Sequence, residues 1–206
     1  MKVAIQQPYF YPYLGYYKLI SSVDLFVLLN DVQYIRRGWV NRNRIEDNTY
    51  ITVPVKKSPR SSLINEIKID YGSNWHYKHC RYIETKYGKG CIEHPVFKFY
   101  KNIENYKFLA CLLKDSIQNV CDFLEIKTKI VDSEQFEIKN KKGEDRILEI
   151  CKKLNAKEYF NLPGGRSLYK KDTFLKKGID LKFVGDIENK LSIVDFIFSN
   201  KDFKND

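Results

Sequence analysis

The chain begins with a short apolar run, a helical pattern and a second apolar run, and this order restricts the fold more than any other feature. Residues 3–6 are predicted to form a strand, residues 14–22 a helix, and residues 24–29 a continuous apolar strand of the kind that is buried on both faces. Two strands joined by one crossover helix run parallel. The N-terminal segment therefore predicts a βαβ unit, a parallel sheet and the α/β class.

The loop of this βαβ unit is rich in aromatic residues and proline. It forms the first part of the stretch QQPYFYPYLGYYKLI at residues 6–20. Pro8 and Pro12 fix the backbone, and Gly15 permits close approach where the helix begins. Open α/β sheets bind anionic ligands at the carboxyl ends of their strands, so we expect this loop to form the floor of a site. The alternative is a tyrosine-rich corner that packs the N-terminus and binds nothing.

An acidic residue and four arginines follow the second strand. Asp31 is expected at the carboxyl edge of the sheet, where it could accept a proton or hold a hydroxyl; the alternative is that it caps a turn. The stretch YIRRGWVNRNRI at residues 34–45 then places four guanidinium groups within nine positions, beside aromatic rings. Guanidinium forks bind phosphate or carboxylate oxygens, and flat rings suit a base or a sugar. This pattern predicts a nucleotide-type pocket.

The arginines are not expected to share one ligand. A strand over residues 39–45 would alternate its side chains between two faces. Trp39, Asn41, Asn43 and Ile45 would then share one side, and Val40, Arg42 and Arg44 the other. Arg36 and Arg37, in the turn at Gly38, are the better candidates.

The remaining pattern predicts a β-hairpin excursion and a helical middle segment within one compact domain of residues 1–206. Residues 49–55 are the return strand of the hairpin, 63–69 an alternating strand, and 71–126 a mostly helical segment with helices at 96–106 and 108–125. Strands are predicted at 128–131, 158–160 and 181–184, and helices at 143–154, 171–177 and 191–198.

A second loop could hold an anion. In NLPGGRSLY, residues 161–169, a strand runs into Gly164 and Gly165, whose backbone N–H groups could cradle a phosphate, with Arg166 and Tyr169 close by. The sequence matches neither a Walker A loop nor GxGxxG, and a plain tight turn is the alternative.

Composition supports an anionic ligand but does not identify it. The formal charge is +10, from 36 basic and 26 acidic residues, and the lysines are spread over several elements, which argues against a polynucleotide track. Five cysteines without CxxC spacing, no signal-peptide pattern and no long apolar run predict a reduced, cytoplasmic protein. His76, His79 and Cys80 match no standard zinc ligand set, so no metal site is predicted.

Four stretches together resemble the WbqC-like proteins of bacteria: QPYFYPYLGYYKLI, NDVQYIRRGWVNRNRI, NLPGGRSLY and LSIVDFIF. The resemblance spans essentially the whole chain. It implies a cytoplasmic protein of surface-polysaccharide assembly, in O-antigen (lipopolysaccharide) or capsule pathways that make nucleotide-linked amino sugars. The family form has two successive aspartates where this chain has Asn30 and Asp31, which leaves Asp31 as the sole acid there.

A weaker likeness is to nucleotidylyltransferases and acyl-adenylate-forming amide ligases. Tyr13-Leu14-Gly15-Tyr16 stands where those enzymes carry a His-x-Gly-His loop. A tyrosine cannot carry the charge of an imidazolium, so ATP chemistry of that type would need arginines or lysines, such as Arg36, Arg37, Lys56 or Lys57, in its place.

The leading hypothesis is an enzyme that transfers an acyl or aminoacyl group to the amino group of a nucleotide-linked sugar. Asp31 would take the proton, and Asn41 and Asn43 would polarise the acyl carbonyl. The predicted substrate-binding residues are Gln7, Tyr9, Tyr13, Gly15, Tyr16, Gln33, Arg36, Arg37, Trp39, Lys56, Gly164, Gly165 and Tyr169.

Two alternatives stay open. One is nucleotidyl transfer or an ATP-dependent amide ligase, which would use ATP with Mg²⁺; under the leading hypothesis the possible co-substrate is an acyl-CoA donor. The other is a non-catalytic module that binds a sugar nucleotide or RNA, although the spread of charge makes nucleic acid the weaker choice.

Overall fold

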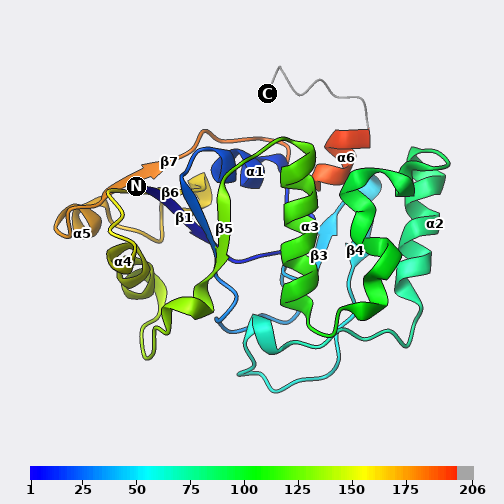
Figure 1. Ribbon diagram of the computed structural model, residues 1–206, viewed down its shortest axis with the longest axis horizontal. Helices are drawn as coiled ribbons and strands as arrows, with labels where there is room; N and C mark the ends of the chain where they lie inside the picture. The colour runs from blue at the N-terminus through cyan, green and yellow to red at the C-terminus, as the bar shows by residue number, and fades with distance from the viewer. Residues whose placement is uncertain (199–206) are drawn as a thin grey trace. The chain divides into compact units, whose positions relative to one another are not determined.

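The chain folds into two compact units, and each unit is built from three separate segments of the sequence (Figure 1). The structure, a computed structural model, describes residues 1–198 apart from the side chain at position 47. The first unit comprises residues 1–7, 15–30 and 126–188, and the second comprises residues 8–14, 31–125 and 189–198. The mixed α/β class, with a parallel sheet, a hairpin and several helices, is confirmed. A single domain over 1–206 stays a prediction.

The first unit is built on a five-stranded parallel sheet whose strand order is β5-β2-β1-β6-β7. The strands are β1 (Lys2–Gln6), β2 (Leu25–Leu28), β5 (Lys129–Asp132), β6 (Glu158–Asn161) and β7 (Asp180–Phe183). The chain starts in the centre, adds β2 and β5 on one side, and then adds β6 and β7 on the other. This is a doubly wound order, and its topological switch point lies between β1 and β6.

Helices of the first unit bury both faces of this sheet. They are α1 (Leu14–Ser21), α4 (Gly143–Lys153) and α5 (Lys171–Leu175). Val3 and Val27 belong to a core with Ile147 of α4 and Phe174 of α5. On the alternate positions, Phe26 packs its ring against Tyr16 of α1 at 5.2 Å. Because strand side chains alternate between faces, the strands read as continuous apolar runs.

The second unit is organised around the aromatic bend at residues 8–14. Its secondary structure comprises β3 (Arg42–Arg44), β4 (Tyr50–Thr52), α2 (Trp75–Tyr87), α3 (Leu109–Phe123) and α6 (Ile193–Phe198). Tyr11 is fully buried, and its hydroxyl donates to the carbonyl of Val96 at 2.8 Å. Its own carbonyl accepts hydrogen bonds from Asn43 Nδ2 at 2.5 Å and Ser192 Oγ at 3.0 Å. The bend is thus a structural core element.

The predicted α-helix at residues 96–106 is wrong in type. The segment Pro95–Asn105 is a 3-10 helix, interrupted by non-helical backbone at Asn102. Its buried residues recur every three positions, as Phe97, Tyr100 and Ile103. A 3-10 helix has three residues per turn, so this spacing places Phe97 and Tyr100, which precede the interruption, on one face.

The predicted strand at residues 63–69 is also wrong. A short 3-10 helix, Ile64–Glu66, interrupts it, and Leu63 and Ile69 keep only isolated bridges to Gln33 and Val55. The carboxylate of Glu66 accepts a hydrogen bond from the backbone N–H of Leu63 at 2.8 Å, which closes the turn. A local side-chain bond of this kind competes with strand pairing.

None of the helices within residues 1–198 is both long and apolar enough to cross a membrane.

His79 joins α2 to the hairpin of the second unit as a neutral imidazole. Its Nε2 accepts a hydrogen bond from the backbone N–H of Thr52 at 3.2 Å, so Nδ1 carries the proton and lies 3.1 Å from the Tyr100 hydroxyl. Burial lowers the pKa of His79 to about 4. Protonation would place an N–H against the N–H of Thr52.

We expect this histidine to make the fold sensitive to acid. The unfolded chain gains a proton on His79 near pH 6.5 and the folded chain only near pH 4, so stability falls as the pH drops through this window. Between pH 8 and pH 5, the unfolding free energy of wild type should fall by about 2 kcal/mol more than that of His79→Gln. Urea unfolding of both proteins at pH 8, 6 and 5 measures this, and parallel losses would contradict it.

Candidate functional site

The second unit contains a groove of about 370 Å³ whose charged lining is entirely cationic. We call it the basic groove. Its charged side chains are Arg36, Arg37, Arg42, Lys56 and Lys57. No acidic side chain is among the described residues that line it, and none of these five cations forms an ion pair with a described carboxylate. Such a groove attracts phosphate or carboxylate groups.

The turn that carries Arg36 and Arg37 is held by backbone carbonyls. A guanidinium nitrogen of Arg36 donates to the carbonyl of Ser58. Arg37 has a left-handed backbone with φ of 61°, and the N–H of Gly38 closes the turn on the carbonyl of Ile35 at 3.1 Å. A left-handed backbone is uncommon for arginine and costs energy, so its presence beside a groove is a reason to look for function.

A neutral hydrogen-bonded pair forms the floor of the basic groove. The hydroxyl of Tyr34 donates to Asn41 Oδ1 at 2.9 Å, and Asn41 Nδ2 donates to the carbonyl of Val53 at 2.8 Å. Burial raises the pKa of Tyr34, although Arg42 and Arg36 act in the opposite direction. Tyr34 therefore stays a neutral phenol. Because the amide of Asn41 is already engaged, its catalytic role stays a prediction and its structural role is evident.

The guanidinium of Arg42 packs against two exposed aromatic rings beside the groove. Trp39 and Tyr50 are 52% and 44% exposed, with ring centroids 6.0 Å apart. The guanidinium of Arg42 lies 4.9 Å from the centre of the Tyr50 ring and 5.9 Å from that of Trp39. It also donates to the carbonyls of Gly38 and Arg37, at 3.0 and 2.6 Å. These contacts hold the two exposed rings, which are tilted by 33° to each other, next to the cationic groove.

The predicted strand over residues 39–45 is too long, and this changes the arginine set. Only Arg42–Arg44 forms β3, because Trp39 and Arg42 are joined by a turn in which Arg42 N–H donates to the Trp39 carbonyl at 3.0 Å. Trp39 therefore lies with Arg42 and not with Asn43. Arg42 joins Arg36 and Arg37 in the groove, whereas the sequence had favoured only Arg36 and Arg37.

Several predicted residues lie elsewhere in the second unit. Asn43 is 2% exposed and its amide bonds the Tyr11 carbonyl and the N–H of Arg44, which is a structural role. Gln33 donates to the carbonyl of Arg60 at 2.8 Å. The hydroxyl of Tyr9 accepts from the N–H of Tyr13 at 3.1 Å. Asp31 is half-buried, directly after Asn30.

Lys190 covers one more predicted ring. Its ammonium lies 4.9 Å from the centre of the Tyr13 ring, which is itself only partly exposed. Catalytic or binding roles for Asp31, Asn43, Gln33, Tyr9 and Tyr13 stay predictions. The aromatic bend and the arginine stretch do meet, since the N–H of Phe10 donates to the carbonyl of Val40 at 3.1 Å.

In the first unit, a polar network marks the switch point of the sheet. Gln6, at the end of β1, donates through Nε2 to Asn161 Oδ1 at the end of β6. Asn161 Nδ2 donates in turn to the Tyr159 hydroxyl at 3.2 Å, and the N–H of Leu162 donates to Asn161 Oδ1 at 2.7 Å. Asn161 is 3% exposed. One amide side chain therefore fixes the start of the Pro-Gly-Gly turn.

The other predicted binding residues of the first unit lie in the packing of α1 or in the turn after β6. Gln7 is exposed, and its carbonyl accepts a hydrogen bond from the hydroxyl of Tyr16 at 3.2 Å. Tyr16 itself is 1% exposed, and Gly15 is buried at the start of α1, so both serve the packing of this helix. Gly164 and Gly165 form the turn after β6. Convergence of this turn with the basic groove stays a prediction.

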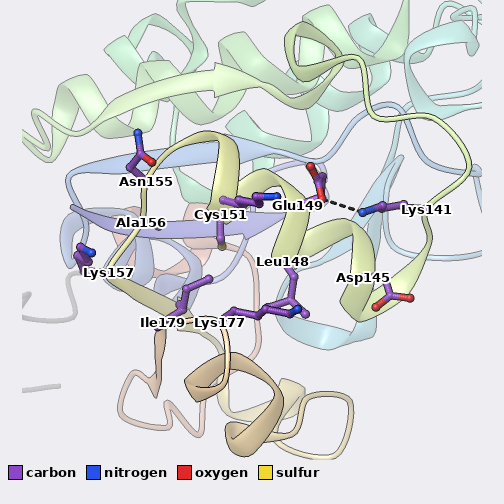
Figure 2. A pocket seen from close by; sticks show the side chains of 12 residues that line it. Lys141, Asp145, Leu148, Glu149, Cys151, Asn155, Ala156, Lys157, Lys177 and Ile179 are labelled. Carbon is purple, nitrogen blue, oxygen red and sulfur yellow. Dashed lines mark hydrogen bonds and ion pairs between the residues drawn. The ribbon is translucent and has the colours of Figure 1, made fainter.

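Two further hollows lie in the first unit. One, of about 460 Å³, is lined by Arg166, Tyr169, Lys171 and Phe183. The other, of about 520 Å³, lies between α4, the loop that enters β6 and the turn that enters β7 (Figure 2). This second hollow is at the amino ends of the strands, opposite the edge where sheets of this class bind ligands. Lys141 in its wall is paired with Glu149 at 2.7 Å.

Comparison with known proteins now gives the family. The family model of the WbqC-like protein family matches residues 7–204. The chain belongs to the WbqC-like protein family. A WbqC-like relative, the uncharacterized protein Rv1507c of Mycobacterium tuberculosis (strain ATCC 25618 / H37Rv), is 31% identical over 217 residues, which cover 96% of this chain and 93% of that protein. No solved structure gives a significant match to this WbqC-like chain.

No group of three His, Cys, Asp or Glu side chains within the described part of this WbqC-like chain is arranged to hold a metal ion. The sequence assigned no role to Lys171 and Phe183, which line the 460 Å³ hollow; it named Arg166 only as a neighbour of the Pro-Gly-Gly turn, and Lys57 only as a possible substitute for an imidazolium charge. The available signal was their position, since Lys171 begins the helix after the Pro-Gly-Gly turn and Phe183 ends the next strand.

The two glycines of the turn should respond differently to substitution. A Cβ on Gly165 would lie 2.6 Å from Asn161 Nδ2, whereas a Cβ on Gly164 would meet nothing within 4 Å. Because the Asn161 network must shift, Gly165→Ala should lower the unfolding free energy by roughly 1–3 kcal/mol. Gly164→Ala is the matched control and should be near neutral. Equal denaturant midpoints for the two variants would show that Asn161 does not hold the turn.

Proposed function

We propose that this protein is a transferase that places an acyl or aminoacyl group on the amino group of a nucleotide-linked sugar in surface-polysaccharide assembly. Membership of the WbqC-like family supports the setting. The observation on which the choice of ligand rests is the basic groove, with five cations and no acid among its described lining residues. A cytoplasmic location belongs to the same proposal.

The basic groove suits a diphosphate. Arg36 and Arg37 present planar guanidinium forks, and Lys56 and Lys57 add ammonium groups to the same lining. The carbonyl contacts of Arg36 and Arg42 orient these side chains without neutralising them. A diphosphate would supply the negative charge that no described side chain of the groove supplies.

The exposed rings suit the rest of a nucleotide. Trp39 and Tyr50 present two exposed rings beside Arg42, which lines the basic groove. Stacking of a base on an aromatic ring contributes about 1–3 kcal/mol. A ligand with its diphosphate against Arg37 and its base on Trp39 would use both features.

Asp31 is our candidate for the proton acceptor. In the reaction, the amine nitrogen of the sugar attacks the acyl carbonyl carbon, a new C–N bond forms, and the donor's leaving group departs with the electrons of the broken bond. The nitrogen loses a proton, which Asp31 would accept. Orientation and carbonyl polarisation are the remaining needs of such a direct transfer.

Four of the five thiols are poorly suited to a covalent intermediate. Burial raises the pKa of Cys80 to about 11 and those of Cys121 and Cys151 to about 12. The pKa of Cys91 is raised as well, by the same cause. A thiol must ionise to act as a nucleophile. These four side chains are therefore poor candidates for an acyl-enzyme.

A binding module for single-stranded RNA is the second candidate, because cations beside exposed rings are also what such modules present. The two differ in their response to salt. RNA binding that neutralises several phosphates should weaken by orders of magnitude between 50 and 200 mM salt, and sugar-nucleotide binding much less. Fluorescence titrations with an oligonucleotide and with UDP-N-acetylglucosamine separate them.

The basic groove can be tested by removing charge without disturbing its backbone. Arg37→Asn keeps a residue that tolerates the left-handed conformation, and it is combined with Lys57→Gln. The control Lys78→Gln/Lys98→Gln removes the same charge from exposed positions outside the groove. Calorimetry with UDP-N-acetylglucosamine and dTDP-glucose should show tenfold or greater loss for the first variant, and less than threefold for the control. Equal losses would refute a groove-bound diphosphate.

The role of Asp31 makes a separate prediction. Asp31→Asn should lower kcat of the transfer about a hundredfold or more, the usual contribution of a positioned base, while the Kd of the sugar nucleotide changes little. Asp122→Asn, on the exposed surface of α3, should change neither. Transfer is followed by mass spectrometry of the acylated sugar nucleotide. Unchanged turnover in Asp31→Asn would remove Asp31 from the mechanism.

A further inference from the structure

The carboxyl edge of the sheet in the first unit has a second cationic hollow, which the proposed function leaves unused. It is lined by Arg166, Tyr169, Lys171 and Phe183, with a volume of about 460 Å³. We call it the α5 pocket. Arg166 and Tyr169 follow β6, Lys171 opens α5, and Phe183 ends β7, so the α5 pocket lies where the carboxyl ends of β6 and β7 meet.

The walls of the α5 pocket are fixed by the Asn161 network. Phe183 is the ladder partner of Asn161, and the N–H of Val184 donates to the Asn161 carbonyl at 3.0 Å. Arg166 is placed by the turn after β6, through a bond from its N–H to the Pro163 carbonyl at 3.1 Å. The ring of Tyr169 packs edge-on against Tyr159 at 5.9 Å. The pocket is thus tied to the switch point.

Its chemistry fits an anion joined to an apolar or flat group. The guanidinium of Arg166 lies 5.7 Å from the centre of the Phe183 ring. Neither Arg166 nor Lys171 forms an ion pair with any of the described carboxylates. Sheets with this winding bind nucleotides at the carboxyl edge near the switch point, and a pocket of this size suits a nucleotide.

We infer that the α5 pocket binds the adenosine 5′-diphosphate group of the co-substrate that delivers or activates the acyl group, a group that acyl-CoA and ATP share. The class of ligand follows from the cations, the rings and the winding of the sheet. Its assignment to the donor rests on the proposed function. The protein then uses one unit for each co-substrate, with the sugar nucleotide in the basic groove of the other.

The test compares ADP, ATP and CoA on the full chain by calorimetry. Arg166→Gln/Lys171→Gln should weaken ADP binding tenfold or more. The control Lys152→Gln/Lys177→Gln removes the same charge from the hollow at the opposite edge of the sheet and should change ADP binding less than threefold. Thermal unfolding confirms that each variant is folded. Binding of ATP with no binding of CoA identifies an ATP-using ligase, and the reverse identifies a CoA thioester donor; either supports the pocket.

Three outcomes would overturn it: no ADP, ATP or CoA binding to wild type at millimolar concentration, equal losses in the two double variants, or loss of ADP binding only in Arg37→Asn/Lys57→Gln. The last outcome would move the nucleotide to the basic groove. If wild type binds ADP but neither of the sugar nucleotides, the proposed acceptor is refuted and the inference about the α5 pocket still holds.

Discussion

The second unit depends on the carbonyl of one residue, Tyr11. This carbonyl accepts hydrogen bonds from Asn43 of β3 and from Ser192, which precedes α6. The Tyr11 hydroxyl donates to the carbonyl of Val96. Tyr11 therefore joins segments that lie 85 and 181 residues away along the chain. Tyr11 has a left-handed backbone with φ of 44°, a conformation that costs a non-glycine residue roughly 1–2 kcal/mol. Breaking either bond would leave a buried polar group unsatisfied, at about 1–3 kcal/mol. The strain persists because the surrounding contacts require it.

The basic groove follows from that anchor. With Asn43 fixed, β3 is held in register with β4, and Asn41 two residues earlier reaches both Tyr34 and the carbonyl of Val53. The mutually repelling cations above this floor are oriented by carbonyl oxygens, which carry partial charge and cannot cancel a full one. The repulsion among Arg36, Arg37 and Arg42 is therefore left for an anion to relieve.

Much of the parallel sheet could be predicted from the sequence, because apolar runs such as Val3–Gln6 and residues 24–29 are dictated by burial on both faces. The strand order could not, since pairing of β1 with β6 joins residues about 155 positions apart and leaves no local signal. The site was partly predictable. Guanidinium groups beside aromatic rings indicated an anion groove, but the turn at Trp39, which brings Arg42 into it, is formed by backbone bonds that periodicity does not report.

Asn161 does for the sheet edge what Asn43 and Asn41 do for the hairpin, and all three are amides. An amide can donate and accept at once, so it satisfies a strand end and a turn with one side chain. It is also neutral. An aspartate at Asn161 would lie beside the turn that carries Arg166, and an aspartate at Asn41 would face the cations of the groove; each would compete with a ligand for the same charge. Neutral amides at these positions organise both pockets without adding a negative charge beside their arginines and lysines.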